Sequence, residues 1–503
     1  MVSMDLTFLL FFFPVLSVIL YFILLHASQR NGPRKLPPGP LPLPILGSLL
    51  KLGEKPHQSL AKLAKVHGPL MTLKLGYVPT VVASSVTMAK EVLQRHDQAL
   101  AGRTVADAVR ALQYCETTMA WLPPNPHWRK LRMICNTQMF TTHRLDSNQA
   151  LRHQKVQELV SHLQQQREVN IGMVTFVTVL NLISNTIFSV DLVLDIGSDS
   201  VQEFKEAVRG IMDEAGRPNF ADYFPFLRVL DPQRIRRRMT CHFKKLYALF
   251  DRLIEERLGQ RAASPDSNKR NDFLDVLLDY SNDNSFKLRR QDIKNLLVEI
   301  FSAGSDTTSS TLEWAMAELL RHPEAMAKVR SELEKTLVSG QSFEESDIAK
   351  LPYLQAVVKE TLRLHPPVPL LIPRRAETTV EISGFTIPRN TQLFVNSWAI
   401  GRDEENWSEP LRFWPERFLR SNIDFRGRDL ELIPFGAGRR ICPGMPLAAR
   451  MVHLILASLI QSFDWKLPSG MNPDDIDMEE KFGITLQMAK PLRAIPVART
   501  SEN

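Results

Sequence analysis

Cysteine is scarce in this sequence, and so are the segments that usually separate domains. Only four cysteines occur among 503 residues, Cys115, Cys135, Cys241 and Cys442, and none forms a CxxC pair. This spacing argues against a disulfide framework or a structural zinc site, and it predicts a reducing compartment for the bulk of the chain. No Gly/Ser-rich linker, low-complexity tract or internal repeat follows the first few dozen residues. The sequence therefore favours one large domain over the two or three that its length would allow.

Features of a nucleic-acid-binding protein are also missing, although the chain is basic. The formal net charge is +7 and the pI is about 9.2, but no DNA- or RNA-binding motif and no stripe of basic and aromatic residues accompanies this charge. A membrane surface or an acidic protein partner explains the charge better, so we expect no nucleic-acid partner. Because 44% of the residues are hydrophobic, the chain can bury a large core.

One long apolar run stands at the N-terminus. Residues 6–25 are apolar over about the length that spans a hydrocarbon core as a helix. Asp5 precedes the run, and Arg30, Arg34 and Lys35 follow it. Since positive charge stays in the cytosol, this order indicates an uncleaved signal anchor, not a cleaved signal peptide. We expect a single membrane span with the bulk of the chain in the cytosol.

A proline-rich segment follows the apolar run. Six prolines between Pro33 and Pro44 exclude a helix and favour a stiff, extended segment. A PxxP ligand for a recognition module is the alternative, but the position between a membrane span and a globular domain favours a spacer. The expected organisation is a membrane anchor at 1–28, a basic and proline-rich hinge at 29–47, and one domain at 48–503.

Helical patterns dominate the rest of the chain. Short β-like pieces at 70–76 and 80–85 alternate with helical stretches such as 88–96 and 151–166. Residues 291–322 form a helical pattern long enough to cross a whole domain. Its centre, 304–311, contains glycine, serine, threonine and aspartate, which are poor helix formers. We therefore expect a local opening or kink in the middle of this helix.

Cys442 lies in an unusual loop, PFGAGRRICPG, at 434–444. Three glycines let backbone approach closely, two arginines bring positive charge, and an apolar helix begins directly afterwards. A helix N-terminus and nearby cations favour a thiolate, which acts as a nucleophile or a metal ligand. A nucleophile would need a histidine base, for which the spacing offers no candidate. An iron ligand needs a stiff, shielded loop with cations for an anionic cofactor, and this interpretation uses every residue of the loop.

The loop matches F-x-x-G-x-R-x-C-x-G, and with it the chain resembles the cytochromes P450, the haem-thiolate monooxygenases. Four other segments agree in order and spacing: KETLR at 359–363, PERF at 415–418, AGSDTT at 303–308 and WRKLR at 128–132. The resemblance extends from the proline hinge nearly to the end of the chain. It implies a mainly α fold with small β-sheets, the cytochrome P450 fold, carrying an N-terminal transmembrane helix.

The resemblance also implies a haem b (iron protoporphyrin IX) with Cys442 as its axial iron ligand. Guanidinium groups suit the haem propionates. The implied haem contacts are Trp128, Arg132, Arg374, Phe435, Gly438, Arg440 and Gly444. Glu360, Arg363 and Arg417 are implied to form a buried charge triad with a structural role. On spacing alone, Glu360 and Arg363 would be an exposed pair on a helix surface.

Asp306 and Thr307 fall where the long helix would pass the iron on the side opposite the cysteine. In the resembling family, the threonine hydroxyl and a water chain deliver protons during the activation of dioxygen, and the acidic neighbour supplies that chain. The resemblance thus implies a catalytic role for Asp306 and Thr307. The alternative is that Thr307 only bonds back to its own helix.

Substrate contacts in this family come from four places, which carry apolar residues in this sequence. They are Val109, Leu112, Ile300, Ala303, Val368, Leu370, Phe482 and Ile484. An apolar pocket of this kind accepts a neutral lipophilic molecule together with O2. Each residue could equally be ordinary core.

Over the rest of its length, the sequence is similar to plant microsomal members of this family that oxidise terpenoids, especially the geraniol-hydroxylase-like subfamily. The resemblance implies an endoplasmic reticulum enzyme that hydroxylates a monoterpenol such as geraniol, in plant secondary metabolism. Its electrons would come from NADPH through a membrane NADPH–cytochrome P450 reductase. Oxidation of a diterpene or a phenolic compound is the first alternative. A haem sensor or a reductase-independent haem-thiolate isomerase is another, against which Asp306 and Thr307 count, because neither needs proton delivery to dioxygen.

Overall fold

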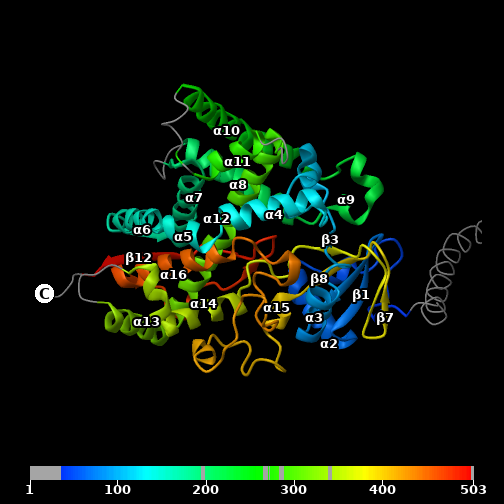
Figure 1. Ribbon diagram of the computed structural model, residues 1–503. Helices are drawn as coiled ribbons and strands as arrows, with labels where there is room; N and C mark the ends of the chain where they lie inside the picture. The colour runs from blue at the N-terminus through cyan, green and yellow to red at the C-terminus, as the bar shows by residue number, and fades with distance from the viewer. Residues whose placement is uncertain are drawn as a thin grey trace, which may run out of the picture.

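The computed structural model describes residues 35–193, 199–263, 270, 272–282, 288–337 and 343–499. The predicted membrane span and the first part of the predicted hinge lie outside these residues. Helices are the main elements of the described chain (Figure 1). They are α2 Pro56–His67, α3 Val86–Lys90, α4 Pro126–Gln138, α5 Thr142–Ser147, α6 Gln149–Leu163, α7 Ile171–Phe188, α8 Asp199–Gly216, α9 Phe220–Tyr223, α10 Ile235–Ala263, α11 Phe273–Asn282, α12 Arg290–Arg321, α13 Pro323–Thr336, α14 Pro352–Leu364, α15 Ser397–Ile400 and α16 Met445–Ser462.

Short turns of helix and short strands connect these elements. The turns are η1 Leu49–Lys51, η2 Glu91–Arg95, η3 Ala108–Glu116, η4 Pro225–Val229, η5 Glu345–Lys350, η6 Pro415–Phe418, η7 Gly438–Arg440 and η8 Pro473–Asp475. The strands are β1 Leu70–Leu75, β2 Val78–Ala83, β3 Gly102–Arg103, β4 Val169–Asn170, β5 Arg374–Arg375, β6 Val380–Ile382, β7 Phe385–Ile387, β8 Gln392–Val395, β9 Phe463–Lys466, β10 Glu480–Lys481, β11 Gln487–Met488 and β12 Arg493–Ala498. The mainly helical fold with small sheets is confirmed, as are the strands and helices predicted between residues 70 and 166.

The largest sheet has five strands in the order β1-β2-β8-β5-β3. β1 and β2 form an antiparallel hairpin in which Leu75 pairs with Val78, and Gly76 has the positive φ of 60° that the tight turn requires. β2 continues parallel to β8, pairing Thr80 with Gln392. In Figure 1 this sheet, with α2 and α3, occupies one end of the molecule, and the long helices occupy the other.

The described part of the proline-rich segment is packed against β1. Pro38 accepts a hydrogen bond from the Thr72 N–H at 2.8 Å. A Cβ on Gly39 would stand 1.8 Å from the Thr72 carbonyl oxygen, so only glycine permits this approach. Gly47 then pairs with Leu75. This portion of the predicted hinge is therefore held on the surface of the domain.

The 32-residue helix α12 passes through the middle of the molecule (Figure 1). It contacts α7, α8, α14 and α16, and at about 1.5 Å per residue it is about 48 Å long. The predicted opening at 304–311 is wrong, because the helix is uninterrupted from Arg290 to Arg321. The hydroxyls of Thr307 and Ser309 donate to the carbonyls of Ala303 and Ser305, so these two side chains are satisfied within the continuous helix.

Two other helices are apolar enough to raise the question of a membrane span. Within the described part of the chain, α7 and α16 pass a test of length and hydropathy for a spanning helix. However, 72% of the α7 window and 61% of the α16 window are buried inside the protein. Both helices pack beside α12 or α6, so they form the core of the helical region.

Candidate functional site

A cavity of about 290 Å³ lies between α12, the start of α16 and the loop that contains Cys442. α4 and the segment after α14 complete its wall. Thr307 and Cys442 line this cavity from different elements. Apolar side chains make up most of the rest, including Ile183, Val358 and Leu447. The cavity is therefore lined by one thiol, by the side of α12 that carries Thr307, and by a mainly apolar wall.

The Cys442 loop is held in one conformation by its backbone. The Cys442 N–H donates to the Phe435 carbonyl at 3.0 Å. Gly436 and Gly438 have φ of 70° and 68°, which side chains disfavour. A Cβ on Gly438 would stand 2.0 Å from the Leu93 carbonyl oxygen, so Gly438 permits contact with η2 and does not line the cavity.

The environment of the Cys442 thiol has opposing effects on its ionisation. Burial raises the pKa of Cys442, whereas the Gly444 N–H, the Arg132 guanidinium and the Met445 N–H lower it. The predicted helix N-terminus and cation are thus both present, but the effect of desolvation is larger, and the net pKa of the Cys442 thiol is raised. A coordinating metal deprotonates a thiol outright, so these surroundings suit a ligand better than a free nucleophile. In the described residues no group of three or more His, Cys, Asp or Glu could hold a metal ion.

The other three cysteines lack this combination of a helix N-terminus, a nearby cation and the cavity. Cys135 is fully buried and burial raises its pKa strongly. Cys115 is partly buried with a raised pKa, and Cys241 is exposed. Neither Cys115, Cys135 nor Cys241 is a lining residue of the cavity.

Four arginines line the same cavity: Arg103, Arg132, Arg374 and Arg440. Burial, reinforced by repulsion from Arg374 and Arg132, lowers the pKa of Arg440 to about 9. Burial lowers the pKa of Arg374 to about 10, and that of Arg103 falls as well, with further repulsion from Arg440. Among the described lining residues only Glu299 carries a carboxylate. A surplus of buried positive charge requires an anion, and the two propionates of a haem have the matching charge and geometry.

Backbone carbonyls hold Arg440 and Trp128 at one end of the cavity. Arg440 donates to the carbonyls of Ala101 at 2.9 Å, Met119 at 3.1 Å and Leu122. The Trp128 indole N–H donates to the Met119 carbonyl at 3.0 Å, and the Arg440 guanidinium lies 4.7 Å from the Trp128 ring centre. Of the predicted haem contacts, all except Gly438 line the cavity.

Thr307 and Asp306 point in different directions. Thr307 lines the cavity, and its hydroxyl donates to the Ala303 carbonyl at 2.6 Å. Asp306 is 4% exposed and does not line the cavity; its Oδ1 accepts a hydrogen bond from Gln487 Nε2 at 2.9 Å. Burial raises the pKa of Asp306, against the effects of the nearby Thr485 hydroxyl, the Arg209 charge and the hydrogen bond from Gln487. The threonine therefore faces the cavity while its acidic neighbour faces the turn before β11.

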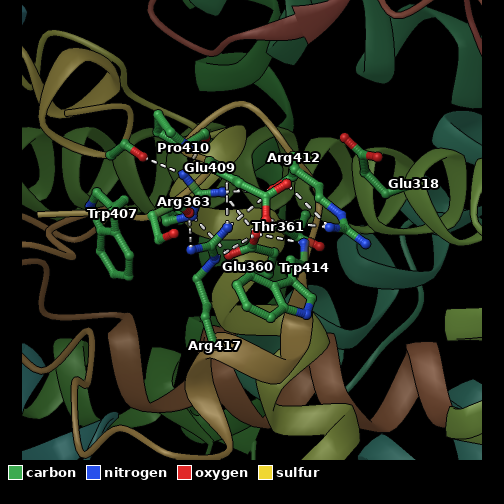
Figure 2. Close-up of polar contacts among 12 residues, drawn as sticks. Glu318, Glu360, Thr361, Arg363, Trp407, Glu409, Pro410, Arg412, Trp414 and Arg417 are labelled. Atoms are coloured by element: carbon green, nitrogen blue, oxygen red, sulfur yellow. Dashed lines mark hydrogen bonds and ion pairs between the residues drawn. The ribbon is translucent and has the colours of Figure 1, made fainter. Parts of the chain in front are cut away.

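Glu360, Arg363 and Arg417 form one fully packed cluster, drawn in Figure 2. Glu360 accepts from Arg363 through both oxygens at 2.8 Å and from Arg417 Nε at 3.0 Å. The side chains of Glu360 and Arg363 are 0% exposed, and that of Arg417 is 7% exposed. Arg363 also donates to the carbonyls of Pro410 and Arg412. The cluster joins α14 to the 401–417 segment.

The predicted substrate residues do not all meet in one place. Ile300, Ala303 and Val368 line the cavity with Cys442. A neighbouring cavity of about 360 Å³ is lined by Val368, Leu370, Phe482 and Ile484. Val368 therefore borders both cavities.

Val109 and Leu112 line neither of these cavities, so the structure does not bring them together with the other predicted substrate residues. Val109 is 2% exposed in the core and Leu112 is 40% exposed. The helical turn η3 is broken at this point, because Leu112 and Gln113 have φ of 50° and 59°. Such left-handed conformations are rare away from glycine, so no sequence pattern foretold this break.

Sequence reasoning missed Arg103 and Glu299. Arg103 stands on the two-residue strand β3 and gave no signal in the sequence. Glu299 did give one, because it lies four residues before Ala303 and eight before Thr307 on α12, at helical spacing on the same face. Burial raises the pKa of Glu299 to about 7, opposed by hydrogen bonds from the Met119 and Ala120 N–H groups.

Comparison with known proteins gives consistent matches. The family model for cytochrome P450 matches residues 37–493. A geraniol 8-hydroxylase from Catharanthus roseus is 53% identical, covering 95% of this chain and 97% of that protein. A geraniol 8-hydroxylase from Swertia mussotii is 52% identical over 98% and 99%. A ferruginol synthase from Salvia miltiorrhiza is 45% identical over 97% and 99%.

Proposed function

The chain belongs to the cytochrome P450 family, and from this premise we propose that it hydroxylates a small lipophilic plant metabolite, a monoterpenol such as geraniol. Membership of the family makes it a monooxygenase, an oxidoreductase. The observation that carries the proposal is one cavity that joins Cys442, Thr307, a cluster of cations and a mainly apolar wall. The two geraniol 8-hydroxylases, similar along nearly their whole length, support the choice of substrate.

A haem b bound in this cavity supplies the reductive activation of dioxygen. Cys442 would hold its iron, and Arg132, Arg374, Arg440 and Trp128 would hold its propionates, because these side chains line the cavity and its arginines outnumber its one carboxylate, Glu299. In the proposed reaction RH, O2, NADPH and H⁺ give ROH, H2O and NADP⁺. The electrons would pass singly from NADPH through a membrane reductase.

Two features of the chain would direct this reaction. The Thr307 hydroxyl, on the cavity face of α12, would hold a proton at its Oγ1 and pass it into the cavity. Asp306, which accepts a hydrogen bond from Gln487 instead of lining the cavity, would supply protons to that hydroxyl through water. The apolar lining, which includes Ile300, Ala303 and Val368, would exclude water and orient a substrate that has few polar groups.

The test is turnover by the full-length, haem-loaded protein in vesicles with NADPH–cytochrome P450 reductase. Geraniol, a diterpene and a phenolic compound are offered separately, and products are detected by the mass of one added oxygen atom. We expect product from geraniol only when reductase, NADPH and O2 are all present. Product from the diterpene or the phenolic compound alone would replace the proposed substrate by the alternative. A new product of unchanged mass, separated by chromatography and formed without reductase or NADPH, would instead indicate an isomerase, and haem binding without any turnover a sensor.

We also propose that the protein is anchored in the endoplasmic reticulum membrane by residues 1–28, with its catalytic domain in the cytosol. An apolar face on the described domain supports this location. The 220–230 segment exposes Phe226, Val229 and Leu230, at 66%, 88% and 72%. Phe226 contacts Tyr77, with ring centres 5.9 Å apart, and Tyr77 lies beside the end of the proline-rich segment, where Ile45 is 67% exposed.

Fractionation of the full-length chain and of a chain lacking residues 1–28 tests this location. The full-length chain should require detergent for release from membranes. The shortened chain should still bind haem, because the described domain forms its cavity without those residues. It should keep a weaker, salt-resistant association through the apolar face, which Val229→Glu should reduce. Full release of the complete chain by salt would refute the anchor.

A further inference from the structure

Glu299 makes contacts that no assigned role explains. Its Oε1 accepts a hydrogen bond from the Ala120 N–H at 2.6 Å, and its Oε2 accepts one from the Met119 N–H at 2.9 Å. One carboxylate on α12 thus takes two consecutive backbone amides of the segment between η3 and α4. Because both oxygens are used, an uncharged side chain of the same size cannot replace both bonds.

The carbonyl groups of the same two residues accept hydrogen bonds from side chains at the cationic end of the cavity. The Met119 carbonyl accepts from Trp128 Nε1 and from Arg440 Nη1. The Ala120 carbonyl accepts from Arg103 Nε at 3.0 Å. The Met119–Ala120 peptide units therefore stand between a carboxylate on α12 and the side chains at the cationic end of the cavity.

A second tie one turn earlier on α12 holds the same segment. Asn295, four residues before Glu299, donates to the Thr117 hydroxyl and accepts from the Tyr247 hydroxyl. Both ties leave the same face of α12. The segment 117–120 is thus fixed to the central helix at two points, and Glu299 is the charged one.

We propose that Glu299 is a positioning residue, through which α12 fixes the Met119–Ala120 turn and thereby the arginine and tryptophan side chains that hold the haem propionates. The charges of Arg103 and Arg440 in turn favour the carboxylate form of Glu299, since both lie within electrostatic reach of it. Without the carboxylate, two amide N–H groups next to a mainly apolar cavity lose their acceptors. The turn then loosens, and the carbonyls that hold Trp128, Arg103 and Arg440 move with it. This inference rests on the proposed haem site, and its test separates the two.

The test compares Glu299→Gln with Glu313→Gln in the full-length haem-loaded protein. Glu313 is the matched control, because it lies on the same helix and its Oε1 likewise accepts a backbone N–H, that of Leu492 at 2.9 Å, but it does not line the cavity. Hydrogen exchange of the 117–122 segment is measured by mass spectrometry, and haem release is measured by transfer to an excess of apomyoglobin. Glu299→Gln should speed exchange in this segment by about tenfold and haem release by about threefold. Glu313→Gln should change neither.

Each contrary result identifies what is wrong. Unchanged exchange in Glu299→Gln would overturn the positioning role, whatever happens to the haem. Faster exchange with unchanged haem release would overturn the link to the propionate side chains. If Glu299→Gln raises KM but leaves hydrogen exchange and haem release unchanged, Glu299 contacts the substrate instead. If Glu299→Gln does not fold, Glu299→Asp replaces it, because aspartate keeps both carboxylate oxygens on a side chain that is shorter by one methylene group. It should speed hydrogen exchange and haem release by smaller factors. Exchange and release equal to those of the parent would overturn the proposal.

Discussion

Replacing Glu360 by glutamine tests how strongly the buried charge cluster holds the molecule together. In the parent, Oε1 accepts from Arg363 Nη2 at 2.8 Å, from the Trp414 N–H at 2.8 Å and from Arg417 Nε at 3.0 Å. Oε2 accepts from Arg363 Nε at 2.8 Å. A glutamine oxygen can keep the first set, but its NH2 group then faces the N–H of Arg363, so one hydrogen bond becomes a contact between two donors.

The larger loss is the charge. Glu360→Gln leaves the guanidinium of Arg363, whose side chain is 0% exposed, and that of Arg417, 7% exposed, without their negative partner. Breaking a buried ion pair from one side costs about 3–5 kcal/mol. With an unfolding entropy on the order of 1 kcal/mol per kelvin for a domain of this length, the apparent Tm should fall by about 4 °C.

The same chain supplies a matched control. Glu409 and Arg412 have the same spacing and lie 3.2 Å apart, but their side chains are 56% and 59% exposed. Glu409→Gln should cost less than about 0.5 kcal/mol, because water already screens this pair. Both variants are scanned by calorimetry with haem bound and at one heating rate, since a chain of this size can unfold irreversibly. Equal shifts in the two variants would refute the reasoning from burial.

The remaining predictions concern the thiol, the cavity threonine and a buried carboxylate. Cys442→Ser should abolish the red-shifted absorption of the reduced carbon-monoxide complex that thiolate ligation produces, whereas Cys241→Ser should keep it; survival of that band in Cys442→Ser would contradict the assignment. Thr307→Ala should retain haem while product per NADPH falls about tenfold and hydrogen peroxide rises, and Thr307→Ser should restore the coupling; equal coupling in Thr307→Ala and the parent would exclude proton delivery. Burial would raise the pKa of Glu480, but the hydrogen bond from His57 at 2.8 Å and the Arg402 charge lower it from 4.5 to about 2. A carboxyl group whose pKa is lowered by folding stabilises the fold at pH values above its unfolded pKa, so Glu480→Gln should lower the free energy of unfolding by about 3 kcal/mol at neutral pH. This difference from the parent should shrink as the pH falls from about 5 toward 2. A difference in the free energy of urea unfolding that stays constant over this range would contradict the pairing.

The local features of the site could be predicted from the sequence. The glycines and the single thiol of 434–444 already required a stiff loop before a helix, and the structure has that loop and α16. The spacing of Glu360 and Arg363 put both on one helix face. The composition of 304–311 suggested an opened helix, but α12 is continuous there, although the Thr307 and Ser309 hydroxyls bond back to carbonyls one turn earlier.

The directions and partners of side chains needed the tertiary structure. Asp306 and Thr307 are neighbours in sequence, yet consecutive residues of a helix lie about 100° apart around its axis, so Thr307 faces the cavity and Asp306 faces Gln487. Leu112 misses the cavities because η3 breaks in a conformation that its residues rarely adopt.

The sequence by itself determined the helical composition, the Cys442 loop and the family of this protein, because each depends on patterns among residues that are close together along the chain. Only the tertiary structure decided that Arg103 joins the cationic cluster and that Glu299 holds Met119 and Ala120. Those contacts join residues about 180 positions apart, and whether a carboxylate is exposed or buried between two amides depends on how the helices pack. Burial then changes the consequence of each charge, since the same Glu–Arg spacing is stabilising at Glu360 and almost neutral at Glu409.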